Sequence, residues 1–182
     1  MSVIQDLSNQ VPFDRRRALL RSVIELFVAN SGRCDQPKLR MFNDIFMLMA
    51  ANVGLDGRAE LAERLADCPQ APVPIIERLA VDELPVAAPV LVRSAVLSDG
   101  TLATIAESGT QGHLLAISSR ADLPGIITDI LVRRGDAQVL LSVAGNHGAR
   151  FSKSGLRELR IRLAKRREPS PETATKLSYE AA

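Results

Sequence analysis

The chain has 182 residues, of which 46% are apolar and 3% aromatic, so it is long enough for one globular domain and too apolar to be disordered throughout. No apolar run approaches the roughly 20 residues of a membrane-spanning helix, and residues 1–10 lack the basic and apolar segments of a signal peptide. The net charge is +2, but residues 1–149 carry 14 Lys and Arg against 17 Asp and Glu, whereas residues 150–182 carry 9 against 4.

The first predicted helix follows a polar lead-in, residues 1–12, and has Asp14 as its expected N-cap. Its apolar residues recur at spacings of three and four, which predicts a single buried stripe. That stripe comprises Leu19, Leu20, Val23, Ile24, Phe27 and Val28. The Asn30-Ser31-Gly32 turn should end the helix.

A second helix should begin near Asp35 and Pro37, since proline is tolerated in a first turn. Its main apolar stripe is Leu39, Phe42, Ile45, Phe46, Met49 and Val53. Met41, Met47 and Leu48 lie off that stripe, so this helix needs cover on more than one side. Either the rest of the chain or a second subunit supplies that cover. We therefore predict that residues 13–56 form a helical pair for docking or dimerisation. Met41, Met47 and Leu48 are the predicted contacts of a homodimer.

Gly54 and Gly57 are expected to break the helical pattern, and a series of short apolar stretches follows. Each stretch is stopped by Pro, Gly or Asp, which predicts short helices. Their expected ranges are 59–67, 73–81, 85–97, 99–107, 111–119, 124–134, 136–144 and 152–167. Pro89 should kink its helix or delay its start.

The expected N-caps of the later helices are Ser98 or Asp99, Asp122 and Asp136. Residues 168–182 are rich in Pro, Ser, Glu and Thr and are predicted to form a disordered tail.

Short motifs recur along this region. Glu-Arg-Leu-Ala occupies both Glu63–Ala66 and Glu77–Ala80. Leu84-Pro85 resembles Leu123-Pro124 at a spacing of about 40 residues, or three helices. Helices this short persist only when they bury their apolar faces against neighbours. The sequence therefore predicts an all-α protein whose residues 58–167 form an α-solenoid.

The region from Arg58 to Ser152 resembles a bacterial family, domain-of-unknown-function family 2336. The resemblance is carried by Glu63–Ala66, Ala71-Pro72, Val86–Leu97, His113–Arg120, and Val143–Asn146 with Phe151-Ser152. It implies a HEAT-like or armadillo-like helical repeat fold. It implies no established activity, so there are no family catalytic residues to transfer.

Candidate catalytic groups are few. His113 and His147 are the two histidines, and an enzyme built on them would need both in one cleft with an acid such as Asp122 or Glu107. The sequence contains no recognisable metal-binding spacing, phosphate-binding loop or nucleophile elbow. We therefore expect no cofactor, no metal and no enzymatic activity.

The two cysteines, Cys34 and Cys68, are too few for a disulfide framework. Free thiols are typical of a reducing cytoplasm, which is the expected location of the chain.

The last predicted helix is the candidate partner-binding element because it is strongly basic. Its candidate residues are Arg150, Lys153, Arg157, Arg160, Arg162, Lys165, Arg166 and Arg167. They could form a solvated cap on the stack, bind an acidic protein, attract an anionic membrane surface or contact nucleic-acid phosphates. We predict a protein-protein interaction module, an adaptor or regulator. The alternative is a nucleic-acid-binding repeat with a groove extended by Arg120, Arg133 and Arg134.

Overall fold

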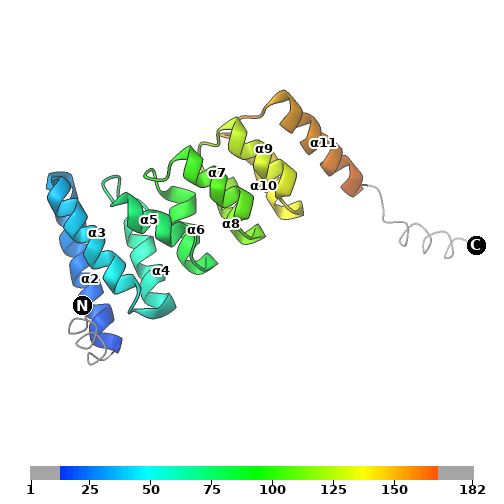
Figure 1. Ribbon diagram of the computed structural model, residues 1–182. Helices are drawn as coiled ribbons and strands as arrows, with labels where there is room; N and C mark the ends of the chain where they lie inside the picture. The colour runs from blue at the N-terminus through cyan, green and yellow to red at the C-terminus, as the bar shows by residue number, and fades with distance from the viewer. Residues whose placement is uncertain (1–12, 168–182) are drawn as a thin grey trace, which may run out of the picture.

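The computed structural model describes residues 13–167, and within them the regular structure is all-helical, as predicted (Figure 1). The helices are α2 (Phe13–Asn30), η1 (Ser31–Arg33), α3 (Gln36–Ala50), α4 (Gly54–Leu65), α5 (Val73–Ala80), α6 (Leu84–Arg93), α7 (Asp99–Ser108), α8 (Gln111–Ser118), α9 (Gly125–Arg134), α10 (Ala137–Gly145) and α11 (Lys153–Arg167). None of these helices is long and apolar enough to cross a membrane. The predictions made for residues 1–12 and 168–182 fall outside the described residues.

The helices stack side by side in two rows (Figure 1). In one row α2, α4, α6, α8 and α10 follow one another, and in the other α7 packs on α9 and α9 on α11. The N-terminal pair continues both rows, because α2 packs on α4 and α3 packs on α5. Within each row a helix therefore packs on the helix two places along the chain, whereas Leu84-Pro85 and Leu123-Pro124 lie three helices apart, as the sequence predicted. Leu84-Pro85 and Leu123-Pro124 mark helix starts in different rows, since proline suits the start of any helix.

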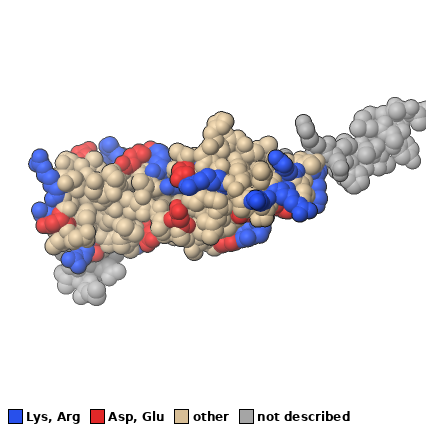
Figure 2. Space-filling model, turned by 90° about the horizontal axis from the view of Figure 1, so that it is seen from above, with Lys and Arg blue, Asp and Glu red and all other residues tan. Residues whose placement is uncertain are grey.

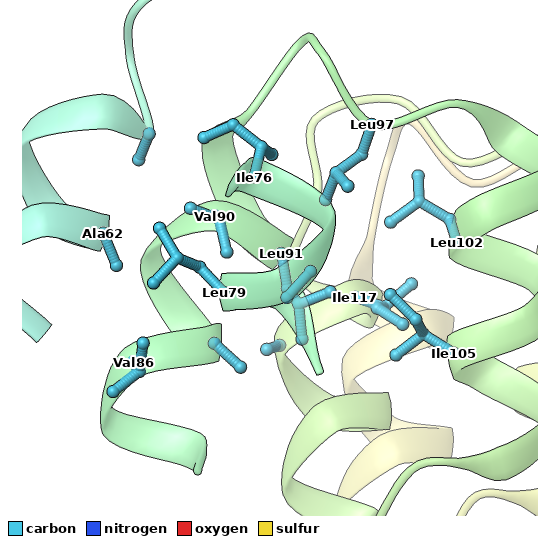
Figure 3. Close-up of a cluster of buried hydrophobic side chains, with 14 of the residues drawn as sticks. Ala62, Ile76, Leu79, Val86, Val90, Leu91, Leu97, Leu102, Ile105 and Ile117 are labelled. Atoms are coloured by element: carbon cyan, nitrogen blue, oxygen red, sulfur yellow. The ribbon is translucent and has the colours of Figure 1, made fainter. Parts of the chain in front are cut away.

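The core lies between the rows and is aliphatic. Figure 3 shows Ile76 and Leu79 of α5 meeting Val90 and Leu91 of α6. Leu102, Ile105 and Ile117 extend this cluster into α7 and α8. Full burial of each such side chain contributes about 1.5–3 kcal/mol. Short helices with one apolar face therefore become stable only within the stack.

The N-terminal pair has an aromatic core. The ring of Phe27 lies 5.0 Å from that of Phe42 and 5.5 Å from that of Phe46, both edge-on. The buried stripe of α2 is narrower than predicted, because Leu19 is 58% and Val28 46% exposed. They lie to either side of the strip that α3 and α4 cover.

Several predicted helix boundaries need correction. The two glycines expected to break the pattern lie inside α4: Gly54 has a φ of 66°, and Gly57 leaves room for the side chain of Val53. Pro89 lies inside α6, which begins at Leu84 and so starts no later than expected. Asp14 lies within α2 and is not its N-cap.

The predicted caps are confirmed at two helices and wrong at a third. The Ser98 side chain accepts from Thr101 N at the start of α7. Asp136 accepts from the backbone at the start of α10. Asp122 caps nothing, because Pro124 precedes α9 and the Asp122 carboxylate pairs with Arg150 instead.

In the C-terminal half of the stack, side chains on or just after a helix bond the carbonyl end of the preceding helix in the same row. Arg120 donates to the carbonyl oxygens of Leu91 (2.6 Å) and Ser94 (2.9 Å) at the end of α6. Arg134 does the same at Ala106 and Gly109, after α7. The last carbonyl groups of a helix have no hydrogen-bond donor within that helix, and they lie at its negative pole. The arginines supply these donors together with a positive charge. We call these bonds the helix-end contacts.

The mostly covered ion pair between Arg58 and Asp82 predicts that the stability of the fold depends on pH. Arg58 Nε lies 2.7 Å from Asp82 Oδ2, and both side chains are mostly covered. Burial acts to raise the pKa of Asp82, but hydrogen bonds from Arg58 and from the Glu83 backbone outweigh it and lower that pKa. A depressed carboxyl pKa contributes stability that is present above about pH 4 and is lost as the pH falls through the folded pKa.

We therefore expect Arg58→Met to lower the free energy of unfolding at neutral pH by on the order of 1–3 kcal/mol. The difference from the parent chain should shrink on acidification toward about pH 3. Urea denaturation at several pH values measures both effects. Arg64→Met is the matched control, since Arg64 is exposed and makes no ion pair. A difference that stays constant with pH would contradict the assignment to Asp82.

Candidate partner-binding surface

The position of α11 is fixed by one narrow face. Leu159 is only 4% exposed, and Gly155 packs so closely on α9 that a Cβ there would lie 1.8 Å from Asp129 Oδ1. The Ser152 hydroxyl accepts from Gly155 N (2.9 Å) at the start of the helix. The side chains opposite this face therefore point away from the stack.

Two of the predicted partner-binding residues act within the stack. Arg162 donates to the carbonyl oxygens of Arg133 (2.9 Å) and Gly135 (3.0 Å), so it makes the helix-end contact for α9. Arg150 donates to both carboxylate oxygens of Asp122 at 3.0 Å. The sequence did not distinguish these two from their basic neighbours.

Four other cations of α11 are exposed and have no hydrogen bond or ion pair: Lys153, Arg157, Arg160 and Lys165. The first three recur at i, i+4 and i+7, so they share one outward face over roughly 10 Å. We call Lys153, Arg157 and Arg160 the basic stripe. Figure 2 shows Lys and Arg side chains gathered at this end of the molecule. The side chains of Arg166 and Arg167 lie outside the described residues.

The three arginines predicted to extend a nucleic-acid groove are engaged elsewhere. Arg120 and Arg134 make helix-end contacts, and Arg133 pairs with Glu107. Burial lowers the pKa of Arg120, although Asp99 and Asp122 oppose this effect. These side chains therefore do not continue the basic stripe into the predicted groove.

The two histidines are not brought together. His113 is buried near the start of α8, where Nε2 donates to the Asp82 carbonyl oxygen (3.0 Å) and Nδ1 lies 2.7 Å from the Thr110 hydroxyl. His147 is exposed and lies beyond the opposite end of α8. It lines an open pocket of about 440 Å³ with residues 118–121. His113 does not line that pocket, so the predicted cleft with both histidines does not form.

The acids proposed for that cleft also have other partners. Glu107 pairs with Arg133 and Asp122 with Arg150. Among residues 13–167, no group of three or more His, Cys, Asp or Glu side chains could hold a metal ion.

The predicted dimerisation residues separate into two environments. Met41 is 51% and Leu48 48% exposed, on one side of α3. Met47 is half-buried and faces α5, with its Sδ 3.9 Å from Arg78 Nη1. Met47 is thus covered within the chain, whereas Met41 and Leu48 are not.

Two further apolar residues, which the sequence did not single out for dimerisation, extend the exposed surface. Leu19 and Leu26 are each 58% exposed on one side of α2. Arg17 and Arg21 contact Glu60 of α4 from the opposite side of α2. We call Leu19, Leu26, Met41 and Leu48 the N-terminal edge, because they point away from α4 and α5.

Comparison with known proteins places the chain in a family. The model of a family described as "uncharacterised protein conserved in bacteria (DUF2336)" matches residues 86–179, more than half of the chain. The chain belongs to this family. The DUF2336 match confirms the predicted resemblance, although it begins at Val86 rather than Arg58. It spans α6 to α11, including the basic stripe, and continues past the last described residue. No curated protein and no solved structure matches the chain.

Proposed function

We propose that this DUF2336 protein is a HEAT-like or armadillo-like helical repeat module, a non-enzymatic cytoplasmic adaptor or regulator. Its mechanism is the binding of an acidic protein segment by the basic stripe on α11. The two-row stack supports the repeat assignment, because successive helices of a row pack together and several bond the carbonyl end of the preceding helix.

One observation carries the binding proposal. Between residues 94 and 165, the arginines at 120, 133, 134, 150 and 162 all bond groups within the chain. Lys153, Arg157 and Arg160 do not, although they occupy a single helix face. Like charges on one face repel one another, so an anionic partner would relieve that repulsion.

A short acidic protein segment fits this surface better than a nucleic acid. The stripe is roughly 10 Å long. Arg120 and Arg134 bond carbonyl groups within the stack, and Arg133 pairs with Glu107 at the surface. Within α11 there is no aromatic side chain on which a base could stack.

The test is binding of a labelled oligo-glutamate peptide and of a DNA duplex to the whole chain. We expect the triple variant K153E/R157E/R160E to lose most of its peptide affinity. The control R33E/R40E/R64E makes the same change of charge at exposed arginines elsewhere and should retain it. Equal losses in the two variants would mean that net charge alone drives binding. Tighter and strongly salt-dependent DNA binding by the parent chain would favour the nucleic-acid alternative.

Affinity capture from the native bacterial lysate extends the same comparison. The parent chain, the stripe variant and the control variant serve as baits, each with and without nuclease. A nuclease-resistant protein retained by the parent and control but lost by the stripe variant is the expected partner.

We also propose a homodimer through the N-terminal edge. Leu19, Leu26, Met41 and Leu48 place four large exposed apolar side chains on one end of the stack. A two-fold contact would pair α2 and α3 of one copy with the same helices of its partner.

We expect M41E/L48E to convert a dimer into a folded monomer, because both residues are exposed and the core beneath them is unchanged. Light scattering after size-exclusion chromatography measures the mass, and circular dichroism reports the fold. V81E/I126E is the control, since Val81 and Ile126 are comparably exposed at other sites. A parent chain that is monomeric at all accessible concentrations would contradict this proposal.

A further inference from the structure

At the C-terminal end of the stack, α11 exposes side chains whose equivalents in the preceding helix of its row, α9, are buried. Arg134 and Arg162 each occupy the tenth position of their helix and make the same helix-end contact, so α9 and α11 can be compared position by position. Thr128 and Val132 of α9 are 0% and 1% exposed. The equivalent residues of α11 are Leu156, which is 37% exposed, and Arg160, which is exposed.

In the row that contains α8 and α10, the last helix likewise exposes positions that are buried in the helix before it. Arg120, after α8, and Asn146, after α10, each donate to the carbonyl end of the preceding helix, which aligns these two helices. Ser118 of α8 is fully buried and bonds Ser142 of α10. Its equivalent, Ala144, is exposed, and the neighbouring Leu141 is 58% exposed. A helix that follows α10 in this row would cover both.

We propose that the chain's own C-terminal segment, residues 168–182, supplies this missing helix, in place of the disordered tail that its composition predicts. The segment is continuous with α11, and the missing position is the next one along the row that holds α8 and α10. In earlier units the chain likewise passes from one row to the other after each helix. Residues 171–182 as a helix would span roughly 18 Å, longer than α10 itself.

The sequence of the segment suits this position. Ser170-Pro171 is typical of an N-cap followed by a first helical residue. Ala174, Leu177 and Ala181 recur at i, i+3 and i+7, which gives one small apolar face for Leu141, Ala144 and Leu156.

Two independent observations favour this occupant over a second copy or another protein. The DUF2336 match extends to residue 179, so most of the segment belongs to the matched family region. The segment also carries Glu168, Glu172 and Glu180 against a single Lys176, opposite in sign to α11. Arg160 borders the uncovered surface and is placed to meet this charge.

Hydrogen exchange of α10 amides in the purified full-length chain tests the proposal. We expect Leu177→Glu to speed exchange of these amides by about ten-fold or more, because it would place a charge in the apolar contact. Thr175→Glu is the matched control: it falls on the opposite side of the proposed helix and should leave exchange unchanged. A chain ending at Glu168 should reproduce the effect of Leu177→Glu.

Three results would overturn the proposal. The first is unchanged α10 exchange in both Leu177→Glu and the truncated chain. The second is protection that rises with protein concentration, which would make a second copy the occupant. The third is an equal effect of Thr175→Glu. The oligo-glutamate affinity of the stripe variant is measured separately and does not report on exchange of the α10 amides.

Discussion

Phe46→Ala should lower the free energy of unfolding by about 3–5 kcal/mol, the largest loss that we expect from any single change in the N-terminal pair. Phe46 is fully buried, and its ring meets that of Phe27 edge-on at 5.5 Å. Truncation would remove both the buried area and the aromatic contact, and it would leave a cavity between α2 and α3. Urea denaturation followed by circular dichroism measures the loss.

Two variants separate this effect from a general sensitivity of the pair. Phe46→Leu should lose about 1.5 kcal/mol or less, because most of the volume is kept. Leu26→Ala removes an exposed side chain from α2 and should change stability by less than about 0.5 kcal/mol in a monomer. If Leu26→Ala were as damaging as Phe46→Ala, Leu26 would have to be buried in solution, as the proposed dimer requires. Repeating the measurement on M41E/L48E would decide between these causes.

The sequence predicted the helices because the residues that begin them act on their near neighbours in the chain. Pro37 begins a helix, and Ser98 and Asp136 bond the backbone of the turns that they start. Those effects depend on neighbours within four residues, which a single sequence displays. Gly54 and Gly57 were misassigned for the opposite reason. Gly54 adopts a positive φ angle and Gly57 packs against Val53. A glycine in the sequence does not by itself show whether a helix begins or ends there.

The sequence did not reveal the two rows of helices, because the contacts that mark them most clearly do not form a sequence motif. The helix-end contacts join residues far apart in the chain: Arg120 to Leu91 is 29 residues, Arg134 to Ala106 is 28, and Arg162 to Val132 is 30. Arg134 and Arg162 themselves recur at a spacing of 28 residues, which the sequence displays. This recurrence was hidden by other arginines, such as Arg133, that occupy the surface.

The candidate binding residues show the same limit. Composition identified α11 as basic, but it could not show which cations already have partners. Arg162 and Arg157 are both arginines of one helix, five residues apart. One bonds carbonyl groups of α9, and the other faces solvent, because a helix turns by about 100° per residue. Only the packing of Gly155 and Leu159 fixes which face is which.

Arg120→Met should lower the free energy of unfolding by about 2–4 kcal/mol, because it leaves two carbonyl groups at the end of α6 without their donor. It also removes a positive charge from the negative pole of that helix. Arg133→Met is the matched control: the same substitution breaks a surface pair with Glu107 and should change stability by less than about 1 kcal/mol.

Hydrogen exchange can locate the damage from Arg120→Met. The amides of α6 and α8 should lose protection first, because Arg120 joins the end of one helix to the end of the other. Arg120→Lys should fall between the parent and Arg120→Met, since an ammonium keeps the charge but cannot present two fixed donors to Leu91 and Ser94. If Arg120→Met and Arg133→Met were equally mild, the helix-end contacts would not hold the rows together. The two-row stack would then depend on its aliphatic core alone.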